Sequence, residues 1–184
     1  TLCRCLAGML VPNSGSLSLS GSCRPIFNTG VGVLPELTGR ENAELLTTFI
    51  YPYLNKREVN DLVTESLIFS ELKEFVDVPY RNYSKGMQTR LFLSVVSARP
   101  SDLLIFDEVF DGADEFFQKK IGKRFLDLMD QSGAIVFVSH TPDQIRDICN
   151  RVMVLHEHKI YFDGNVEQGI ELYQNLNLQS PNQQ

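Results

Sequence analysis

Apolar residues near the start of the chain follow the spacing of a helix. From Leu2 to Leu10 they recur every three or four positions, which predicts a helix with one buried face that ends at the turn 11–15 (VPNSG). The next segment, 16–21 (SLSLSG), alternates between apolar and polar residues and therefore predicts a half-buried strand. Residues 23–37 are rich in Gly and Pro, which predicts a loop.

The middle of the chain carries the start signals of three helices. The segments 38–41 (TGRE) and 55–58 (NKRE) each form a capping box, and the second predicts a helix over about 58–72. A third helix is predicted after Ser84, its N-cap, and continues into an apolar run. We therefore expect residues 38–98 to be a mainly helical insertion.

The pattern changes after residue 98 to that of an α/β fold. Two continuous apolar runs are typical of parallel strands buried on both faces. They lie in 102–106 (DLLIF), which is apolar from Leu103 onward, and in 134–138 (AIVFV). Helices are predicted at 115–129 and from Pro142, and VMVL and KIYF indicate a closing pair of strands. This order predicts an α/β fold with a mostly parallel sheet, followed by a polar, disordered tail at 176–184.

Composition excludes several classes of protein. The 184 residues include 17 basic and 23 acidic side chains, and this net charge of −6 argues against nucleic-acid binding. No apolar run approaches the roughly 20 residues of a membrane-spanning helix. The four cysteines are expected to be small core residues in a reducing compartment. His156 and His158 flank a glutamate, but no third ligand is evident, so a zinc site is not expected.

Polar residues follow both predicted parallel strands, at the edge where ligands of such sheets bind. Asp107 and Glu108 come after the first strand. Two such carboxylates can orient a hydrated Mg²⁺ and polarise a water molecule, or they can simply cap the next helix. Ser139 and His140 come after the second strand. His140 could contact a terminal phosphate at that edge, although a lone histidine after a strand is more often structural.

A third candidate site is the segment NYSKGMQTR. Ser84 is the predicted helix N-cap, and Gly86 permits close approach to the backbone. The free N–H groups of a helix N-terminus bind anions, but most serine caps bind nothing.

In combination, these motifs resemble the ATP-binding cassette (ABC) ATPases. YSKGM stands where that family has its signature segment, so the resemblance assigns Ser84, Lys85 and Gly86 to nucleotide binding. LLIFDE is similar to the Walker B strand. The resemblance then implies that Asp107 binds nucleotide-associated Mg²⁺ through water, and that Glu108 is the catalytic glutamate.

Three further residues take roles from the same resemblance. DGAD is similar to the D-loop, with Asp114 its aspartate, and His140 corresponds to the catalytic switch histidine. The first helix follows the phosphate-binding loop in this family, so Thr1 would be a nucleotide-binding residue at the end of that loop. The loop itself would lie upstream. We therefore expect the chain to be a fragment that is inactive without it.

The resemblance also implies an architecture. The fold would be a P-loop NTPase-like ABC ATPase core that lacks its N-terminal strands. Residues 1–37 and 99–175 would form the catalytic α/β lobe, and 38–98 the helical subdomain with the signature motif.

Three segments are similar to one branch of the family, the exporters of capsular polysaccharide, O-antigen or teichoic acid. They are PELTGREN, YSKGM and DEVFDGADEFFQKK. This branch implies ATP and Mg²⁺ as cofactors, a head-to-tail dimer with a second copy, and an integral-membrane permease. The subunit would lie on the cytoplasmic face of the membrane. A regulatory or scaffold cassette without transport, and an incompetent remnant without Walker A, remain alternatives.

The predicted permease contact is the loop 28–36. The apolar residues in and just before this loop could equally be core residues; they are Ile26, Phe27, Val31 and Leu34. This loop lacks the glutamine that the family usually has near Thr29, and Lys85 and Met87 stand where the usual signature has Gly and Gln.

Overall fold

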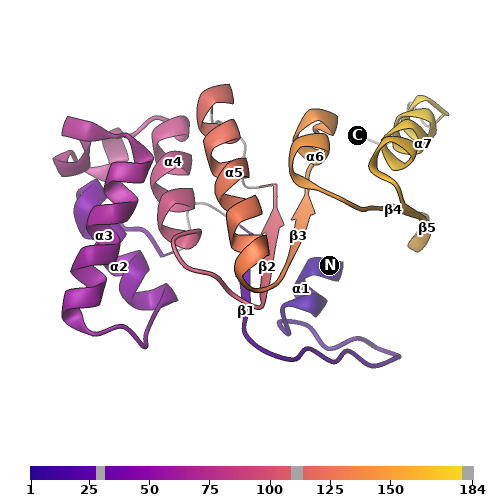
Figure 1. The fold of residues 1–184 in the computed structure, drawn as a ribbon, viewed down its shortest axis with the longest axis horizontal. Helices are drawn as coiled ribbons and strands as arrows, with labels where there is room; N and C mark the ends of the chain where they lie inside the picture. The colour runs from indigo at the N-terminus through magenta and orange to yellow at the C-terminus, as the bar shows by residue number, and fades with distance from the viewer. Residues whose placement is uncertain (28–31, 109–113, 180–184) are drawn as a thin grey trace. The chain divides into compact units, whose positions relative to one another are not determined.

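A three-stranded parallel sheet organises the larger of two units, Thr1–Val138 and Ser139–Gln184, in the computed structural model (Figure 1). The structure describes residues 1–27, 32–108 and 114–179. The strands are β1 (Cys23–Ile26), β2 (Leu103–Asp107) and β3 (Ala134–Val138), in the order β1-β2-β3. Both pairings are parallel, and β2 in the middle is buried along its first four residues. The predicted α/β fold with a parallel sheet is confirmed.

The first strand lies later in the chain than predicted. The alternating segment 16–21 is not a strand, and β1 comes from the predicted loop 23–37. Both leucines of 16–21 are exposed, whereas Ile26 is buried, so the strand beside β2 is the one that buries apolar surface there. Pro25 is tolerated because β1 has one open edge in the described sheet.

The first helix is shorter than predicted. Helix α1 spans Leu2–Leu6, because Gly8 adopts a left-handed conformation (φ 72°) that ends it. Met9 and Leu10 are consequently exposed rather than part of a buried helix face. Cys3 is the buried residue of α1 and packs against β2.

Three helices pack together in the middle of the chain: α2 (Gly39–Ile50), α3 (Lys56–Ser70) and α4 (Lys85–Val96). Both predicted capping boxes are present, and Ser84 caps α4. Helix α3 begins and ends two residues before the predicted 58–72, and a left-handed residue closes it. Two 3₁₀ helices, η1 (Lys73–Asp77) and η2 (Tyr80–Asn82), connect α3 to α4.

Helix α5 (Glu115–Ser132) lies between β2 and β3 in sequence and packs on the sheet through its aromatic residues. The rings of Phe106 on β2 and Phe125 on α5 are 4.3 Å apart between centroids. Gly133 then starts the return to β3, where a Cβ atom would come within 2.2 Å of the Asp102 carbonyl oxygen.

The second unit is a hairpin flanked by helices. It contains α6 (Pro142–Ile148), the antiparallel strands β4 (Val152–His156) and β5 (Lys159–Gly164), and α7 (Val166–Gln179). The predicted closing strand pair is thus confirmed. Because α7 reaches Gln179, residues 176–179 are helical rather than part of a disordered tail, and 180–184 lie outside the described residues.

The four cysteines are free thiols, with Cys3 buried and the others half-buried. Within the described parts of the chain, no three metal-ligating side chains gather in a group, and His156 and His158 are no exception. No helix among these residues has the length and apolar character that crossing a bilayer requires.

Candidate functional site

The carboxylates Asp107 and Glu108 lie together at the carboxyl end of β2. Asp107 is the last residue of the strand and is half-buried beside Val138 of β3. Glu108 is exposed, and its backbone N–H donates a 3.1 Å hydrogen bond to the Val138 carbonyl oxygen. That bond fixes the backbone of the pair at the edge of the sheet.

Glu108 has a left-handed backbone, with φ 54°. Residues other than glycine rarely adopt this conformation. They keep it only where contacts with the surrounding structure stabilise it. Among the described residues, the other non-glycine residues with a left-handed backbone are Glu71 and Lys73, at and just after the end of α3, and Glu157 and His158, in the β4–β5 turn. Left-handed residues are common at such places. Glu108 is different, because it ends a buried parallel strand. Strain of this kind concentrates at functional sites.

The signature segment begins at the N-cap of α4. The Ser84 hydroxyl oxygen accepts a 3.2 Å hydrogen bond from Met87 N–H. Ser84 and Lys85 are exposed and Gly86 is half-buried. The structure therefore presents this helix start to solvent, with N–H groups of the first turn that an anion can reach.

Tyr83, which sequence reasoning missed, ties this segment to η1 by a hydrogen bond and lies against the start of α2. Its hydroxyl donates to the Phe75 carbonyl oxygen at 2.7 Å, and burial, followed by the charge of Asp77, raises the pKa of Tyr83 to about 12. A Cβ atom on Gly39 would lie 1.9 Å from the same hydroxyl oxygen. The glycine of TGREN thus makes room for the tyrosine of YSKGM. A shared role of these two motifs was not evident from their spacing.

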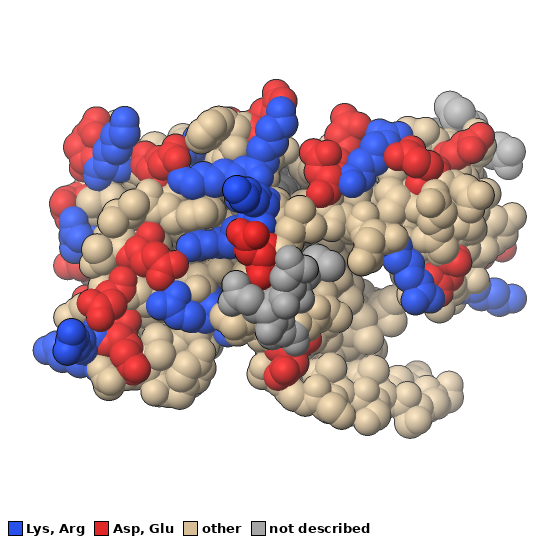
Figure 2. Space-filling model, in the orientation of Figure 1, with Lys and Arg blue, Asp and Glu red and all other residues tan. Residues whose placement is uncertain are grey.

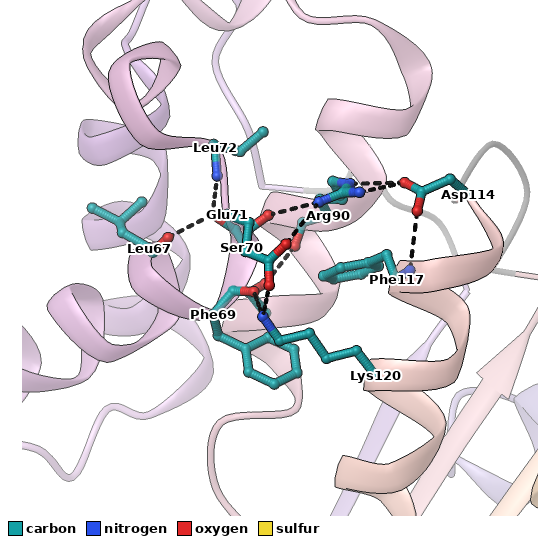
Figure 3. Close-up of polar contacts among 10 residues, drawn as sticks. Leu67, Phe69, Ser70, Glu71, Leu72, Arg90, Asp114, Phe117 and Lys120 are labelled. Carbon is teal, nitrogen blue, oxygen red and sulfur yellow. Dashed lines mark hydrogen bonds and ion pairs between the residues drawn. The ribbon is translucent and has the colours of Figure 1, made fainter.

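Asp114 caps α5 and also holds an arginine from α4 (Figure 3). One carboxylate oxygen accepts from Phe117 N–H at 3.0 Å, and the other accepts from Arg90 Nε at 3.0 Å and Nη2 at 2.5 Å. Burial raises the pKa of Asp114, but these hydrogen bonds outweigh it and the pKa lies below its usual value. The rest of the predicted D-loop, 111–113, lies outside the described residues.

Arg90 was also missed. Its sequence signal is a single charged residue directly before the apolar run 91–93 inside a helix, which indicates a partner on another element. Through Arg90, the structure links the helix capped by Ser84 to Asp114.

The remaining predicted residues lie elsewhere. Thr1 is the N-cap residue of α1, but its side chain makes no cap hydrogen bond. Cys3, in the first turn of this helix, has its pKa raised by burial and then by the charge of Asp107. His140 belongs to the second unit, where its Nδ1 is 3.1 Å from the Tyr173 hydroxyl. Its predicted meeting with Asp107 and Glu108 stays a prediction.

The donors at the end of β2 suit a hydrated magnesium ion. Mg²⁺ prefers hard oxygen ligands, keeps several of its waters and is usually bound through one or two carboxylates. Asp107 and Glu108 supply two carboxylates on consecutive residues, one half-buried and one exposed. The pair therefore fits Mg²⁺ held largely through water.

Comparison with known proteins settles the family. The ABC transporter family model matches residues 1–111, more than half of the chain. The chain belongs to the ABC transporter family. A solved structure, an inward-facing conformation of a putative metal-chelate type ABC transporter, has a TM-score of 0.72 at 16% identity over 95% of this chain and 73% of that chain. At that identity the likeness shows the fold alone, and it confirms the predicted ABC ATPase core.

Relatives within the ABC transporter family cover most of the chain. The O-antigen export system ATP-binding protein RfbB of Klebsiella pneumoniae is 39% identical over 168 residues, which are 91% of this chain and 68% of that protein. The corresponding protein RfbE of Yersinia enterocolitica is 34% identical over 91% of this chain and 69% of its own length. The teichoic acids export ATP-binding protein TagH of Enterococcus faecalis is 33% identical over 85% of this chain and 34% of its own.

Proposed function

We propose that this chain is the ATP-binding and ATP-hydrolysing part of an ABC transporter that exports a cell-surface polysaccharide. The observation that carries the proposal is the carboxylate pair Asp107–Glu108 at the end of a buried parallel strand, with Glu108 held in a left-handed conformation. The export of O-antigen and of teichoic acids by its relatives supports the choice of substrate class.

Each residue of the pair would have a separate role. Asp107 would hold Mg²⁺ through its waters, and the ion would offset the charge of the nucleotide phosphates. Glu108 would accept a hydrogen bond from the attacking water and aim it at the terminal phosphate. Catalysis of this kind depends on positioning and electrostatics rather than on covalent chemistry with the protein. His140 would contact the same phosphate.

A second copy of the chain would complete the site. Ser84, Lys85 and Gly86 would bind the nucleotide of the partner, and Thr1 would lie beside the chain's own nucleotide. The exposure of the α4 N-terminus supports this role, because a composite site needs it accessible. Two-fold symmetry would then give two equivalent sites per dimer.

A membrane permease would dock on the helical region, with the subunit at the cytoplasmic face of the membrane. Residues 28–31 of the predicted contact loop lie outside the described residues, but Leu34 in the same loop is exposed. Leu45 and Phe49, which lie one turn apart on α2, are exposed as well. Exposed apolar side chains that are close together support a protein contact.

Replacing the matched part of a relative tests this function. The 168-residue region of the Klebsiella protein would be exchanged for the corresponding part of this chain, giving a replacement protein. In a strain that lacks the Klebsiella protein, we expect it to restore O-antigen at the cell surface. ATP hydrolysis without export would contradict the polysaccharide assignment, and a folded replacement protein with neither activity would contradict the whole proposal.

A further inference from the structure

Arg90 joins the helix that Ser84 caps to the start of α5 (Figure 3). Its guanidinium donates two hydrogen bonds to one Asp114 oxygen, and its carbon lies 5.0 Å from the centre of the Phe117 ring, which is fully buried. Nη1 donates to the Ser70 carbonyl oxygen at 3.4 Å. One side chain on α4 thereby holds both the end of α3 and the beginning of α5.

A lysine on α5 reinforces the same junction. Lys120 Nζ donates to the Phe69 carbonyl oxygen at 2.9 Å and forms an ion pair with Glu71, the left-handed residue that closes α3. Glu71 also lies 3.8 Å from Arg90. We call Arg90, Asp114, Glu71 and Lys120 the Arg90 clasp. Figure 2 shows Lys and Arg side chains gathered over α4 and α5, with acidic side chains among them.

Shielding from solvent strengthens the clasp. The Arg90 side chain is 19% exposed, so its ion pairs are less screened than those on an open surface. The guanidinium fork presents several donors in a fixed plane, which an ammonium group cannot reproduce. Loss of Arg90 would leave Asp114, the α5 cap, without its cationic partner.

We propose that Arg90 is a positioning residue that holds the signature helix and the start of α5 as one body. This inference rests on the proposed function. The clasp joins Asp114, which the family resemblance assigns to nucleotide binding, to the helix whose N-terminus carries the Ser84 segment that the chain would offer to a second copy. It also gives a physical role to DGADEFFQKK, which contributes Asp114, Phe117 and Lys120.

Arg124 on α5 provides a matched control. Its side chain is 16% exposed, it pairs with Glu65 of α3 at 2.9 Å, and it donates to the Ser94 carbonyl oxygen of α4 at 3.2 Å. It therefore bridges the same three helices with similar burial. Among the residues that the structure describes, its contacts do not include Asp114 or the start of α4.

Kinetics of the replacement protein separate positioning from simple stabilisation. Arg90→Gln should lower kcat for ATP hydrolysis on the order of 10-fold to 100-fold, because displaced catalytic groups lose rate steeply. The KM for ATP should stay within about threefold, which marks a loss in the transition state rather than in binding. Arg124→Gln should keep kcat within about twofold, and Arg90→Lys should recover only part of the rate. Equal kcat values for Arg90→Gln and Arg124→Gln would overturn the proposal.

Amide hydrogen exchange of this chain without nucleotide tests the clasp separately from catalysis. Gln88 N–H bonds to the Ser84 carbonyl oxygen at 3.0 Å, and Gln118 N–H bonds to that of Asp114 at 2.9 Å. In Arg90→Gln, both amides should exchange about tenfold faster, because the two helix starts open together. In Arg124→Gln they should not. If the unaltered replacement protein lacks ATPase activity, the proposed function fails, and the exchange data alone decide the clasp. Unchanged exchange at both amides in Arg90→Gln overturns it.

Discussion

Asn42 holds the segment before α2 with a single buried side chain, and its removal should cost a measurable part of the stability. Its amide nitrogen lies 2.9 Å from the Leu34 carbonyl oxygen, 3.2 Å from that of Leu37 and 3.0 Å from that of Thr38. Its amide oxygen accepts from Leu34 N–H at 2.7 Å. The side chain is fully buried on α2.

The cost of Asn42→Ala follows from these contacts. An amide nitrogen has two hydrogens, so its three carbonyl partners share two donated bonds, and the accepted bond makes three in total. At about 1 kcal/mol net for each bond, the loss is about 3 kcal/mol. Alanine regains roughly 0.5 kcal/mol in helix propensity. We therefore expect Asn42→Ala to lower the free energy of unfolding by about 2–3 kcal/mol.

Urea unfolding of the chain, followed by circular dichroism, measures this difference. Asn60→Ala is the matched control, because Asn60 is exposed on α3 and the same substitution there should change stability by less than about 0.5 kcal/mol. At this chain length, the Asn42→Ala melting temperature should fall by about 4–12 °C. A loss for Asn42→Ala no larger than that for Asn60→Ala would refute the reasoning.

Two further predictions concern the stability of the chain, and a third concerns the proposed dimer. Gly39→Ala should cost about 1–3 kcal/mol, because the new Cβ would lie 1.9 Å from the Tyr83 hydroxyl oxygen, and adding Tyr83→Phe should recover part of the stability in thermal unfolding. Hydrogen bonds from Ser22, through its backbone N–H and then its hydroxyl, hold the pKa of Asp102 below its usual value. The stabilisation from Asp102 is thus present above the unfolded pKa and lost as pH falls through the folded one, so Asp102→Asn should flatten the fall in stability below about pH 4. For the proposed dimer, Ser84→Arg and Glu108→Gln replacement proteins should each lack ATPase activity, whereas their mixture should recover about a quarter of the parent rate through heterodimers with one intact site; no recovery would contradict the composite site.

Sequence reasoning succeeded where a signal is local. The capping boxes at 38–41 and 55–58 and the cap at Ser84 depend on side chains within three residues of the helix start, so spacing alone was sufficient. The buried strand that ends at Asp107 was likewise evident, because its first four residues are buried and all four are apolar.

It failed where distant partners decide. The segment 16–21 has the alternation of a strand, but pairing with β2 selects Cys23–Ile26, and alternation does not encode that choice. The contacts of Arg90 with Asp114 and of Tyr83 with Gly39 join residues far apart in the chain, and nothing in the local pattern specifies them.

The roles of the site residues depend on nucleotide chemistry at the end of β2. Family membership and the left-handed Glu108 both favour that chemistry. The role of Glu108 is the most specific part of this account, since it names one carboxylate and one step.

Steady-state ATP hydrolysis by the replacement protein, with and without Glu108→Gln, tests that role most directly. The change keeps the size of the side chain but removes the charge that polarises water, so the rate should fall on the order of 10²–10³-fold while ATP binding persists. Glu44→Gln, on the exposed face of α2, is the control and should leave the rate unchanged. A Glu108→Gln rate within about threefold of the parent would contradict the assignment of Glu108 as the catalytic glutamate.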